Sequence, residues 1–296
     1  MKIKDIIKKD FSVSGDIEKD ISGLAYDSRN IKGNEIFFAI KGENVDSHDL
    51  IEDSIKRGAI GIVYDITRGI EHLMSKYPDV TWIGVNDTRD AIAYVANNFY
   101  GRPSEEAILI GITGTNGKTT TSYIIKSILE KNGCNVGLIG TIKYLIKDES
   151  FDALHTTPEA VNYQSLLRDM VDKGCSHIVS EVSSHALAQK RVDYTRFKAS
   201  IFTNLTRDHL DFHKNMEDYF RAKERLFTEL LDEDGIAVIN IDDPYGIRIV
   251  SDIRKEALMF KKRIITYGIC SNDADIMAQD IKITFKGTSF RIKTQK

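Results

Sequence analysis

Apolar and polar residues alternate along the chain in segments whose lengths predict a mixed α/β protein. In the first hundred residues, short apolar runs typical of strands are interspersed with longer amphipathic stretches typical of helices. The expected strands are 35–40, 59–64 and 81–85, and the expected helices are 48–57 and 88–99. A glycine and a proline then fall within residues 100–104, which is typical of a domain boundary. We therefore expect a small α/β domain at residues 1–102 and a second domain at residues 103–296.

The second domain shows a regular succession of strands and helices. Strands are expected at 108–113, 136–142, 177–182, 199–203, 235–241 and 263–267, and helices at 118–132, 160–173 and 215–231. Segments of these lengths in this order favour a mostly parallel sheet with helices on both faces. Over residues 275–294 apolar and polar residues alternate, which predicts an antiparallel hairpin that turns near residues 286–288.

The composition excludes several classes of protein. The 296 residues are 42% hydrophobic and 29% charged, an ordinary balance for a folded protein with two cores. The net charge of −3 gives no positive field that would recruit nucleic acid or an anionic membrane. The three cysteines lack a C-x-x-C pair and fit neither a disulfide framework nor a zinc site. Because no signal peptide is evident and no apolar run approaches about 18 residues, we expect a cytoplasmic protein.

The strongest chemical signal is a glycine-rich segment between an expected strand and an expected helix. Residues 111–121 read Gly-Ile-Thr-Gly-Thr-Asn-Gly-Lys-Thr-Thr-Thr. Its glycines let backbone N–H groups converge on phosphate oxygens, Lys118 can reach the β- and γ-phosphates, and the Thr119 hydroxyl can bind Mg²⁺. The spacing departs from the common form, because Ile112 stands where the first glycine is expected. A glycine-rich turn without a ligand is the alternative, but the Gly-Lys-Thr sequence in this context favours a cradle for ATP.

Other side chains with chemical potential follow the later strands. Glu181 ends an expected strand, where a carboxylate is well placed to hold the Mg²⁺ of a nucleotide. His209 and His213 also follow a strand, although their spacing fits a helix-face pair or ordinary surface residues equally well. On the sequence alone, Lys223 is a solvated charge on an amphipathic helix. Residues 240–243 can contact a nucleotide or can form an Asx turn that caps the next helix.

Together these segments resemble the Mur ligase superfamily, and within it the MurE-type ligases, which join an amino acid to UDP-N-acetylmuramoyl-L-alanyl-D-glutamate. The related folate polyglutamating enzymes usually differ just after the loop lysine. The implied fold is an N-terminal UDP-substrate-binding domain followed by a mostly parallel-sheet, ATP-binding central domain. The segments that carry the resemblance are 27–29, 114–121, 156–159, 181–191, 203–211, 222–223 and 240–243.

The resemblance implies roles that the residues themselves leave open. It also implies that Lys223 is carried as an N-carbamate, an anion formed when a neutral lysine reacts with carbon dioxide. The implied catalytic residues are Lys118, Lys223 and His209. The implied nucleotide-binding residues are Gly114, Thr115, Asn116, Gly117, Lys118, Thr119, Thr120 and Asn240. The implied substrate-binding residues are Ser28, Glu43, Asn44, Val45, Thr156, Thr157, Ser183, Gln189 and Arg191. The implied metal ligands are Thr119, Glu181, His209 and Lys223.

The implied reaction forms an amide bond in peptidoglycan precursor synthesis. The D-glutamate carboxylate attacks the γ-phosphorus of ATP, giving an acyl phosphate and ADP, and an incoming amine then displaces phosphate. The amine belongs to a diamino acid, with meso-diaminopimelate favoured over L-lysine. ATP and Mg²⁺ are the implied cofactors. The implied partners are the UDP-muramoyl dipeptide and the free diamino acid, for a monomer that binds neither nucleic acid nor membrane.

Members of the family continue beyond the position of Lys296 into a domain that binds the incoming amino acid. We therefore expect a C-terminally truncated ligase that does not complete the reaction alone. A non-catalytic nucleotide or UDP-sugar binding module is the alternative, but it has no need of Glu181, His209 and Lys223 together. A generic P-loop kinase or ATPase leaves residues 27–29 and 156–159 unexplained.

Overall fold

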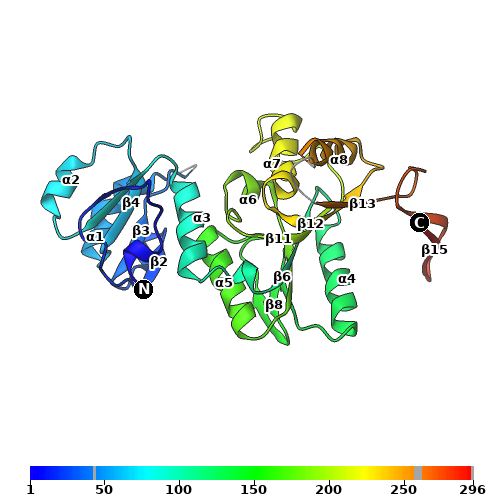
Figure 1. Ribbon diagram of the computed structural model, residues 1–296, viewed down its shortest axis with the longest axis horizontal. Helices are drawn as coiled ribbons and strands as arrows, with labels where there is room; N and C mark the ends of the chain where they lie inside the picture. Colours follow the sequence, from blue (N-terminus) through cyan, green and yellow to red (C-terminus); the bar gives the residue numbers. More distant parts are fainter. Residues whose placement is uncertain (43–44, 257–261, 295–296) are drawn as a thin grey trace. The chain divides into compact units, whose positions relative to one another are not determined.

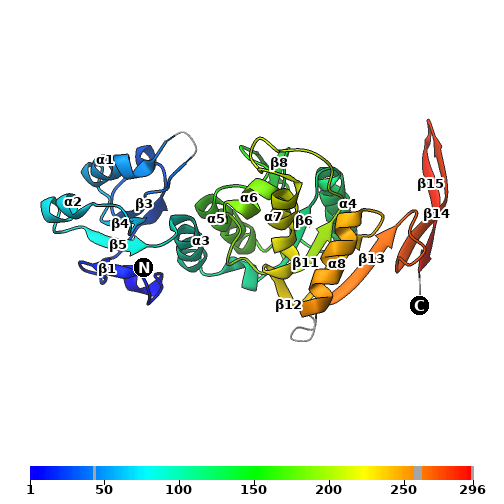
Figure 2. The same cartoon turned by 90° about the horizontal axis from the view of Figure 1, so that it is seen from above.

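The computed structural model describes residues 1–42, 45–256 and 262–294, which form two compact units. Unit 1 comprises Met1–Pro103, Glu159–Arg168 and Lys190–Tyr194, and unit 2 comprises Ser104–Pro158, Asp169–Gln189 and Thr195–Lys296. Figures 1 and 2 label the elements of both units. Within the described ranges, no helix is both long and apolar enough to cross a membrane.

Unit 1 is built on a five-stranded sheet in the order β1-β5-β4-β3-β2. Strand β1 pairs antiparallel with β5, and the other strands are parallel. Apolar residues of successive positions point to opposite faces, since Ile36 and Phe38 join one core cluster and Phe37 joins the other. The strands are β1 Ser12–Ser14, β2 Gly23–Ala25, β3 Glu35–Phe38, β4 Gly61–Asp65 and β5 Thr81–Val85; the helices are α1 Ile51–Lys56, α2 Glu71–Lys76 and α3 Thr88–Phe99.

Unit 2 is built on a ten-stranded sheet in the order β15-β14-β13-β12-β11-β6-β10-β7-β8-β9. The strands from β14 to β7 are parallel, and both ends of the sheet are antiparallel. The expected hairpin near the C-terminus is therefore confirmed as β14 and β15. The strands are β6 Ile108–Thr113, β7 Val136–Ile139, β8 Lys143–Ile146, β9 Glu149–Asp152, β10 His177–Glu181, β11 Phe197–Phe202, β12 Leu231–Asn240, β13 Arg263–Gly268, β14 Ile276–Thr284 and β15 Gly287–Thr294.

Helices cover both faces of the larger sheet, which confirms the expected α/β fold class. On one face, Ile110 and Ile112 of β6 pack in a cluster with residues of α4. On the other face Gly111 lies against Phe197 and Leu226, the latter in α7. Helices α7 and α8 lie side by side in both views (Figures 1 and 2) and are joined by hydrogen bonds from Arg248 to Glu217. The helices of residues 104–296 are α4 Lys118–Lys131, α5 Ala160–Asp172, α6 Ser184–Ala188, α7 Met216–Thr228 and α8 Pro244–Glu256. Most of α5, up to Arg168, belongs to unit 1.

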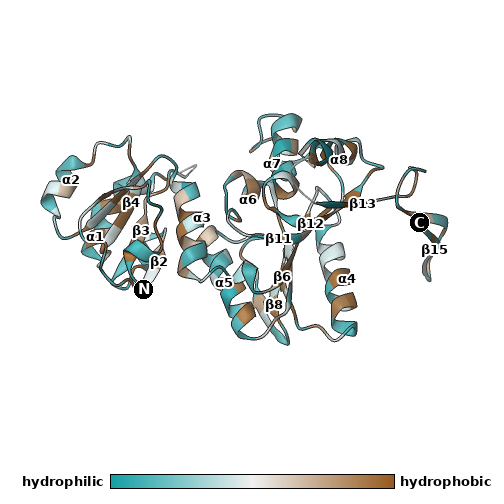
Figure 3. Cartoon of the chain, viewed as in Figure 1, coloured by the Kyte–Doolittle hydropathy of each residue, from teal (hydrophilic) through white to brown (hydrophobic). Residues whose placement is uncertain are grey.

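Hydropathy follows this layered arrangement. Figure 3 shows apolar residues concentrated on strands such as β4 and β6, whereas α7 is mostly hydrophilic on the side in view. The inner face of α7 is nevertheless apolar, because Phe220, Leu226 and Phe227 are fully buried. Because this apolar face packs on the sheet, α7 is held in place beside the loop that follows β6.

Candidate functional site

The strand order places three loops at one edge of the larger sheet. Strand β6 lies between β10 and β11, although the chain passes from β6 to β7 before it returns to β10. The strand order therefore reverses at β6, and at such a switch point the carboxyl ends of parallel strands border a ligand crevice. The loop after β6, Glu181 at the end of β10 and Thr203 after β11 all meet at this edge.

The glycine-rich loop connects β6 to α4 as the sequence predicts. Gly114 and Gly117 have φ values of 148° and 88°, which L side chains rarely adopt. A Cβ atom on Gly114 would also lie 1.9 Å from Oγ1 of Thr203, so glycine is required there. Gly117 is the N-cap of α4 and provides no side-chain cap. The N–H groups of the first turn thus remain available for an anion, which the helix dipole favours.

Two lysines converge on this loop. Nζ of Lys118 donates to the carbonyl oxygens of Gly114 and Thr115, at 2.9 and 3.0 Å. Nζ of Lys223 donates to the same Gly114 oxygen at 3.0 Å and lies 4.7 Å from the ring centroid of Tyr219. Burial lowers the pKa of Lys118, despite the opposing charges of Glu181 and Asp208. Burial, reinforced by the charge of Lys118, lowers the pKa of Lys223 well below its ordinary value. The interpretation of Lys223 as a solvated charge is wrong, because its exposed fraction is 1%.

Glu181 is fully buried and surrounded by hydroxyl groups. Its carboxylate accepts hydrogen bonds from Oγ1 of Thr119 and from Oγ1 of Thr141, both at 2.9 Å. The backbone N–H of Thr141 adds a third at 3.2 Å, and Oγ of Ser122 lies 3.4 Å away. Neutral donors can thus hold a buried carboxylate in one orientation beside the first turn of α4.

The two histidines after β11 have different surroundings. His209 has a half-exposed side chain, a φ of 51° and its Nε2 atom 3.6 Å from the Asp208 carboxylate. His213 is buried, and its Nε2 atom lies 2.9 Å from Oγ of Ser184. Burial, reinforced by the nearby charges of His185, Lys223 and His209, lowers the pKa of His213 to about 4. His213 is therefore neutral at physiological pH, and His209 is the more accessible of the two.

The residues expected to bind the muramoyl dipeptide in unit 2 form local hydrogen bonds. Thr157 donates from Oγ1 to the carbonyl oxygen of Glu181 at 2.9 Å and accepts from the N–H of Ser183 at 3.1 Å. Oγ1 of Thr156 lies 3.1 Å from Oγ1 of Thr141. Ser183 caps α6, and Gln189 follows as its C-cap. Thr157 thus contacts the backbone of Glu181, whereas Thr156 contacts Thr141, which is hydrogen-bonded to the Glu181 carboxylate.

The remaining expected substrate residues lie in unit 1. Ser28 is buried and begins a short 3₁₀ turn, which the Asp27 carboxylate caps by accepting the N–H of Arg29. Arg191 forms an ion pair with Glu159 at 2.7 Å. Val45 is exposed, and the other two residues of its expected group, Glu43 and Asn44, lie outside the described residues.

Residues 240–243 hold other parts of the site in place. Nδ2 of Asn240 donates to the carbonyl oxygen of Thr203 at 2.8 Å. Asp243 accepts the N–H of Tyr245 at 2.9 Å, which confirms the interpretation as an Asx turn before α8. Its other carboxylate oxygen accepts the N–H of Leu205 at 2.7 Å. The alternative interpretation, that Asn240 contacts a nucleotide, stays a prediction.

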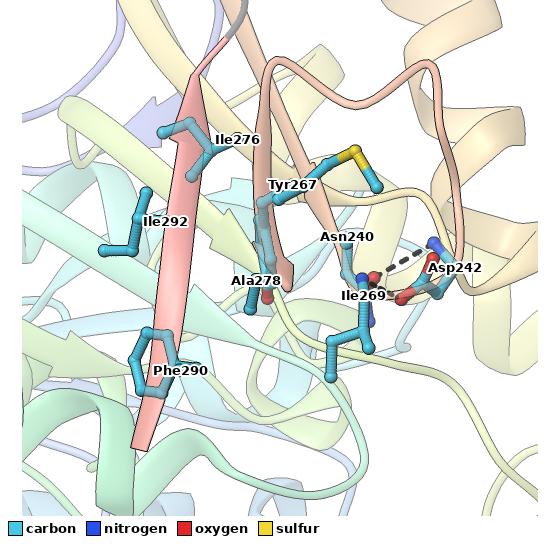
Figure 4. A pocket seen from close by; sticks show the side chains of 10 residues that line it. Asn240, Asp242, Tyr267, Ile269, Ile276, Ala278, Phe290 and Ile292 are labelled. Carbon is cyan, nitrogen blue, oxygen red and sulfur yellow. Dashed lines mark hydrogen bonds between the residues drawn. The ribbon is translucent and has the colours of Figure 1, made fainter. Parts of the chain in front are cut away.

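A hollow of about 290 Å³ lies beside these residues, between β13 and the C-terminal hairpin. Asp242 at its edge accepts backbone N–H groups from Ile269, Cys270 and Ser271. Figure 4 shows the apolar side chains of the hairpin and the polar side chains that line the hollow. Its lining includes Asn240, Asp242, Tyr267, Ile276, Ala278, Phe290 and Ile292.

Two residues that contact the glycine-rich loop or Glu181 were not predicted from the sequence. Tyr219 lies four positions before Lys223, and its hydroxyl is 3.1 Å from Oγ1 of Thr115 in the loop. The helical i, i+4 spacing was the available signal, because it puts both side chains on one face of α7. Thr141 follows β7 and contacts Glu181, and its place after a parallel strand was the corresponding signal.

Hard oxygen ligands for a metal ion lie beside the first turn of α4. Among the residues that the structure describes, no three His, Cys, Asp or Glu side chains form a group that could hold a metal ion. The Thr119 hydroxyl and the Glu181 carboxylate, 2.9 Å apart, are nevertheless the ligand types that Mg²⁺ prefers beside nucleotide phosphates. The donor set therefore fits a Mg²⁺ ion that obtains its other ligands from phosphate and water.

The fold defines an α/β protein. At the point where its strand order reverses, it carries a glycine-rich loop of the type that binds phosphate. Comparison with known families identifies it further. The model of the Mur ligase middle domain matches residues 112–296, and that of the Mur ligase family catalytic domain matches residues 20–100. The chain belongs to the Mur ligase family, as its motifs predict.

Two curated relatives have the same name, UDP-N-acetylmuramoyl-L-alanyl-D-glutamate--2,6-diaminopimelate ligase. The protein from Clostridium tetani (strain Massachusetts / E88) is 45% identical over 294 residues, which cover 99% of this chain and 58% of that protein. The one from Geobacter metallireducens (strain ATCC 53774 / DSM 7210 / GS-15) is 43% identical, and the match covers 95% of this chain and 53% of that protein. The chain thus spans a little more than half the length of these relatives.

Solved structures show the same fold. A ligase of the same name has a TM-score of 0.82 at 24% identity, and the similarity covers 100% of this chain and 58% of that one. MurF ligase from Thermotoga maritima in complex with ADP has a TM-score of 0.56 at 21% identity, with 92% and 56% covered. At these identities the similarity supports the architecture alone.

Proposed function

We propose that this chain provides the nucleotide-binding and UDP-substrate-binding parts of an ATP-dependent amide ligase of peptidoglycan precursor synthesis. The ligase adds a diamino acid to UDP-N-acetylmuramoyl-L-alanyl-D-glutamate and releases ADP and phosphate. The names of the relatives favour 2,6-diaminopimelate over L-lysine as the diamino acid, and we propose its meso form. The observation that carries the proposal is the buried Lys223 at the carbonyl oxygen of Gly114, since a simple nucleotide-binding turn has no need of a second lysine there.

The loop and the first turn of α4 supply the electrostatic part of the reaction. In the proposed reaction, the D-glutamate carboxylate attacks the γ-phosphorus of ATP, and the diamino acid then displaces phosphate from the acyl phosphate. The Lys118 ammonium exchanges its contacts with the carbonyl oxygens of Gly114 and Thr115 for contacts with phosphate oxygens. Its positive charge then stabilises the negative charge that develops on the transferring group. The proposed nucleotide contacts are Gly114, Thr115, Asn116, Gly117, Lys118, Thr119, Thr120 and Asn240.

The proposal includes Mg²⁺, which would neutralise phosphate charge when bound. Thr119 and Glu181 are its first proposed ligands, because their oxygens already lie within hydrogen-bond distance of one another. His209 is accessible and is the third. Lys223 joins them as an N-carbamate, which forms when its neutral amine adds to carbon dioxide and loses a proton. The lowered pKa of Lys223 favours the neutral amine that this addition requires.

The proposal assigns the UDP-muramoyl dipeptide to both units. We propose residues 1–102 as the UDP-substrate-binding domain, with Ser28 and residues 43–45 contacting the UDP moiety. We propose residues 103–296 as the ATP-binding central domain, in which Thr156, Thr157, Ser183 and Gln189 hold the muramoyl dipeptide together with Arg191. The protein is proposed to act as a monomer.

Binding of Mg·ADP to the 296-residue chain is the direct test of the nucleotide site. Calorimetric titration of the unmodified chain is expected to give saturable binding, and Lys118→Ala is expected to weaken it about tenfold or more, because a charge-assisted hydrogen bond to phosphate is lost. Lys131→Ala is the matched control, since Lys131 is exposed at the opposite end of α4. Equal affinity of the Lys118 and Lys131 variants for Mg·ADP would contradict the proposed nucleotide site.

The substrate is tested in the protein as it occurs in its source cells. ADP release is expected when ATP, UDP-N-acetylmuramoyl-L-alanyl-D-glutamate and meso-diaminopimelate are all present, and less with L-lysine. Binding of the UDP substrate without any ADP release would instead favour a non-catalytic binding module. If the protein neither binds the UDP substrate nor turns it over, both the ligase and the non-catalytic binding module are excluded.

A further inference from the structure

The segment that follows β11 runs along the glycine-rich loop and is hydrogen-bonded to it at successive residues. The N–H of Thr115 donates to the carbonyl oxygen of Asn204 at 2.8 Å. The N–H of Thr206 donates to Oγ1 of Thr115 at 3.0 Å. Oγ1 of Thr203 donates to the carbonyl oxygen of Asn116 at 2.7 Å. Residues 203–206, here called the brace, thus contact the loop immediately before the first turn of α4.

One side chain of the brace binds both backbone groups of a single loop residue. Oδ1 of Asn204 accepts the N–H of Asn116 at 3.0 Å, and Nδ2 of Asn204 donates to the carbonyl oxygen of Asn116 at 3.1 Å. Only a primary amide of this length offers a donor and an acceptor with that separation. Aspartate keeps the acceptor and loses the donor, and alanine loses both.

The brace is also held by residues at the end of β12 and just after it. Asp243 accepts the N–H of Leu205 at 2.7 Å, and Nδ2 of Asn240 donates to the carbonyl oxygen of Thr203 at 2.8 Å. Asn240 is the last residue of the long parallel strand β12, and Asp243 follows three residues later. The brace is therefore anchored to the end of β12 as well as to the loop.

We infer that Asn204 is a positioning residue that holds the peptide groups of Asn116 in the geometry required for phosphate binding; this inference rests on the proposed function. The N–H groups of Thr115 and Asn116 are engaged by Asn204. The N–H groups of Thr115 and Asn116 thus face the brace, and we assign the backbone contacts with phosphate to the N–H groups from Gly117 to Thr120, at the start of α4. Asn204 acts through the loop and does not touch the nucleotide.

The experiment compares Asn204→Ala and Asn204→Asp with a matched control in the same 296-residue chain. The control is Asn132→Asp at the C-terminal end of α4, which also removes one Nδ2 donor, to the carbonyl oxygen of Ile128 at 2.8 Å. Mg·ADP affinity is measured by calorimetry well below the melting temperature. Loss of two hydrogen bonds is expected to weaken binding about tenfold in Asn204→Ala, whereas the control stays within about twofold.

Amide hydrogen exchange measured by NMR separates positioning from a general loss of stability. The N–H of Asn116 is expected to exchange about tenfold faster in Asn204→Ala and to stay protected in Asn204→Asp, which retains the acceptor. Amides of β6 and β10 are expected to exchange at the unmodified rate in both variants. Because Asn204→Asp is nearly isosteric, it supplies the comparison even if the alanine variant folds poorly.

The inference and the proposed function fail in different ways. If the unmodified chain binds Mg·ADP and Asn204→Ala binds it equally well, the positioning role is overturned while the nucleotide site stands. If the unmodified chain does not bind Mg·ADP, the proposed function fails and the phosphate part of the inference fails with it. If the N–H of Asn116 exchanges at the unmodified rate in Asn204→Ala, Asn204 does not hold the peptide groups of Asn116, whether or not the chain binds Mg·ADP.

Discussion

Single side chains around the glycine-rich loop serve two neighbours at once. Asp243 caps α8 with one carboxylate oxygen and holds the N–H of Leu205 with the other. Asn240 likewise donates to Thr203 and accepts the N–H of Asp242 at 3.0 Å. Such sharing satisfies buried polar groups with few residues, because each carboxylate or amide has several hydrogen-bonding positions. A change at one of these positions is therefore expected to disturb two elements.

Two glycines in the larger sheet allow a test of how rigid the neighbouring side chain is. A Cβ on Gly111 would lie 2.7 Å from the Phe197 ring, and a Cβ on Gly137 would lie 2.5 Å from Sδ of Met170. The buried ring cannot bend, whereas the methionine side chain has several rotatable bonds. We expect Gly111→Ala to lower the free energy of unfolding by about 1–3 kcal/mol, and Gly137→Ala by less than about 1 kcal/mol. Urea unfolding measures both values.

A compensating variant serves as the control for Gly111. Phe197→Leu replaces the flat ring by a smaller side chain, so Gly111→Ala is expected to cost less in that background than in the unmodified chain. A Gly137→Ala variant that is as unstable as Gly111→Ala would contradict the argument from side-chain flexibility.

Element boundaries could be predicted where a local signal marks them. The expected bounds of β5, β6 and α3 agree with the structure, and α3 begins after Asp87, whose side chain accepts N–H groups from Arg89 and Asp90. Helices α2 and α6 were missed, and α8 was expected only in the interpretation of residues 240–243 as an Asx turn that caps the next helix. Strand β12 begins at Leu231, four residues before the expected start, because Leu231 pairs with Phe197 of β11 on the far side of an irregularity in the register. Pairing of this kind is set by the neighbouring strand and not by local periodicity.

The residues of the site show the same division between local and tertiary information. The glycine-rich loop and Glu181 were predictable, since their residue types and their place after strands are local features. The burial of Lys223 was not, because a lysine on an amphipathic helix carries no sign of which residue its face will meet. Asn204 was visible within a motif, but its contact with Asn116 depends on β11 and β6 being neighbours.

In unit 1, a hydrogen-bonded group joins α3 to the chain's N-terminal segment and to residues 190–194. The Tyr194 hydroxyl donates to the Asp90 carboxylate at 2.9 Å, and Nζ of Lys8 donates to the same carboxylate at 2.7 Å. Burial alone would raise the pKa of Asp90, but the hydrogen bonds from Lys8 and Tyr194 outweigh it and lower the pKa. The charged form of Asp90 therefore stabilises unit 1 above its ordinary pKa, and this stabilisation is lost as the pH falls through the folded-state value.

Tyr194→Phe is expected to lower the stability of unit 1 by about 1 kcal/mol at pH 7, because it removes one hydrogen bond to a charged group and keeps the ring. The stability difference between the variant and the unmodified chain should begin to shrink as the pH falls below the ordinary pKa of an aspartate, about 3.9, and should go on shrinking as the pH falls through the lower folded-state pKa of Asp90. Urea unfolding between pH 7 and pH 3 measures it. Tyr26→Phe is the control, since its hydroxyl donates to the neutral Oδ1 of Asn162 at 3.1 Å. A pH-independent difference for Tyr194→Phe would contradict the role of Asp90.

At the scale of the molecule, unit 1 is not one continuous stretch of chain. Residues Glu159–Arg168 and Lys190–Tyr194 belong to it although they lie between segments of unit 2. Ala160 and Val161 are buried in the same apolar cluster as Ile36 and Phe38 of β3. No local pattern in the sequence announces this membership, because the periodicity of α5 predicts a helix and not the unit against which the helix packs.

Residues 1–103 expressed alone are therefore expected to be less stable than unit 1 within the whole chain. The fragment lacks the burial of Val161, worth about 1.5–3 kcal/mol for a side chain of that kind, and it lacks the Tyr194 hydrogen bonds to Asp90. Amides of β3 and β4 should thus exchange faster in the fragment than in the whole chain, and its urea midpoint should be lower. Val161→Ala in the whole chain isolates the contribution of α5. It should raise the exchange rates of the same amides by a smaller factor than the truncation does. If the fragment and the whole chain protect β3 and β4 equally, the first 103 residues are a self-sufficient unit, and the returning segments add contacts without adding stability.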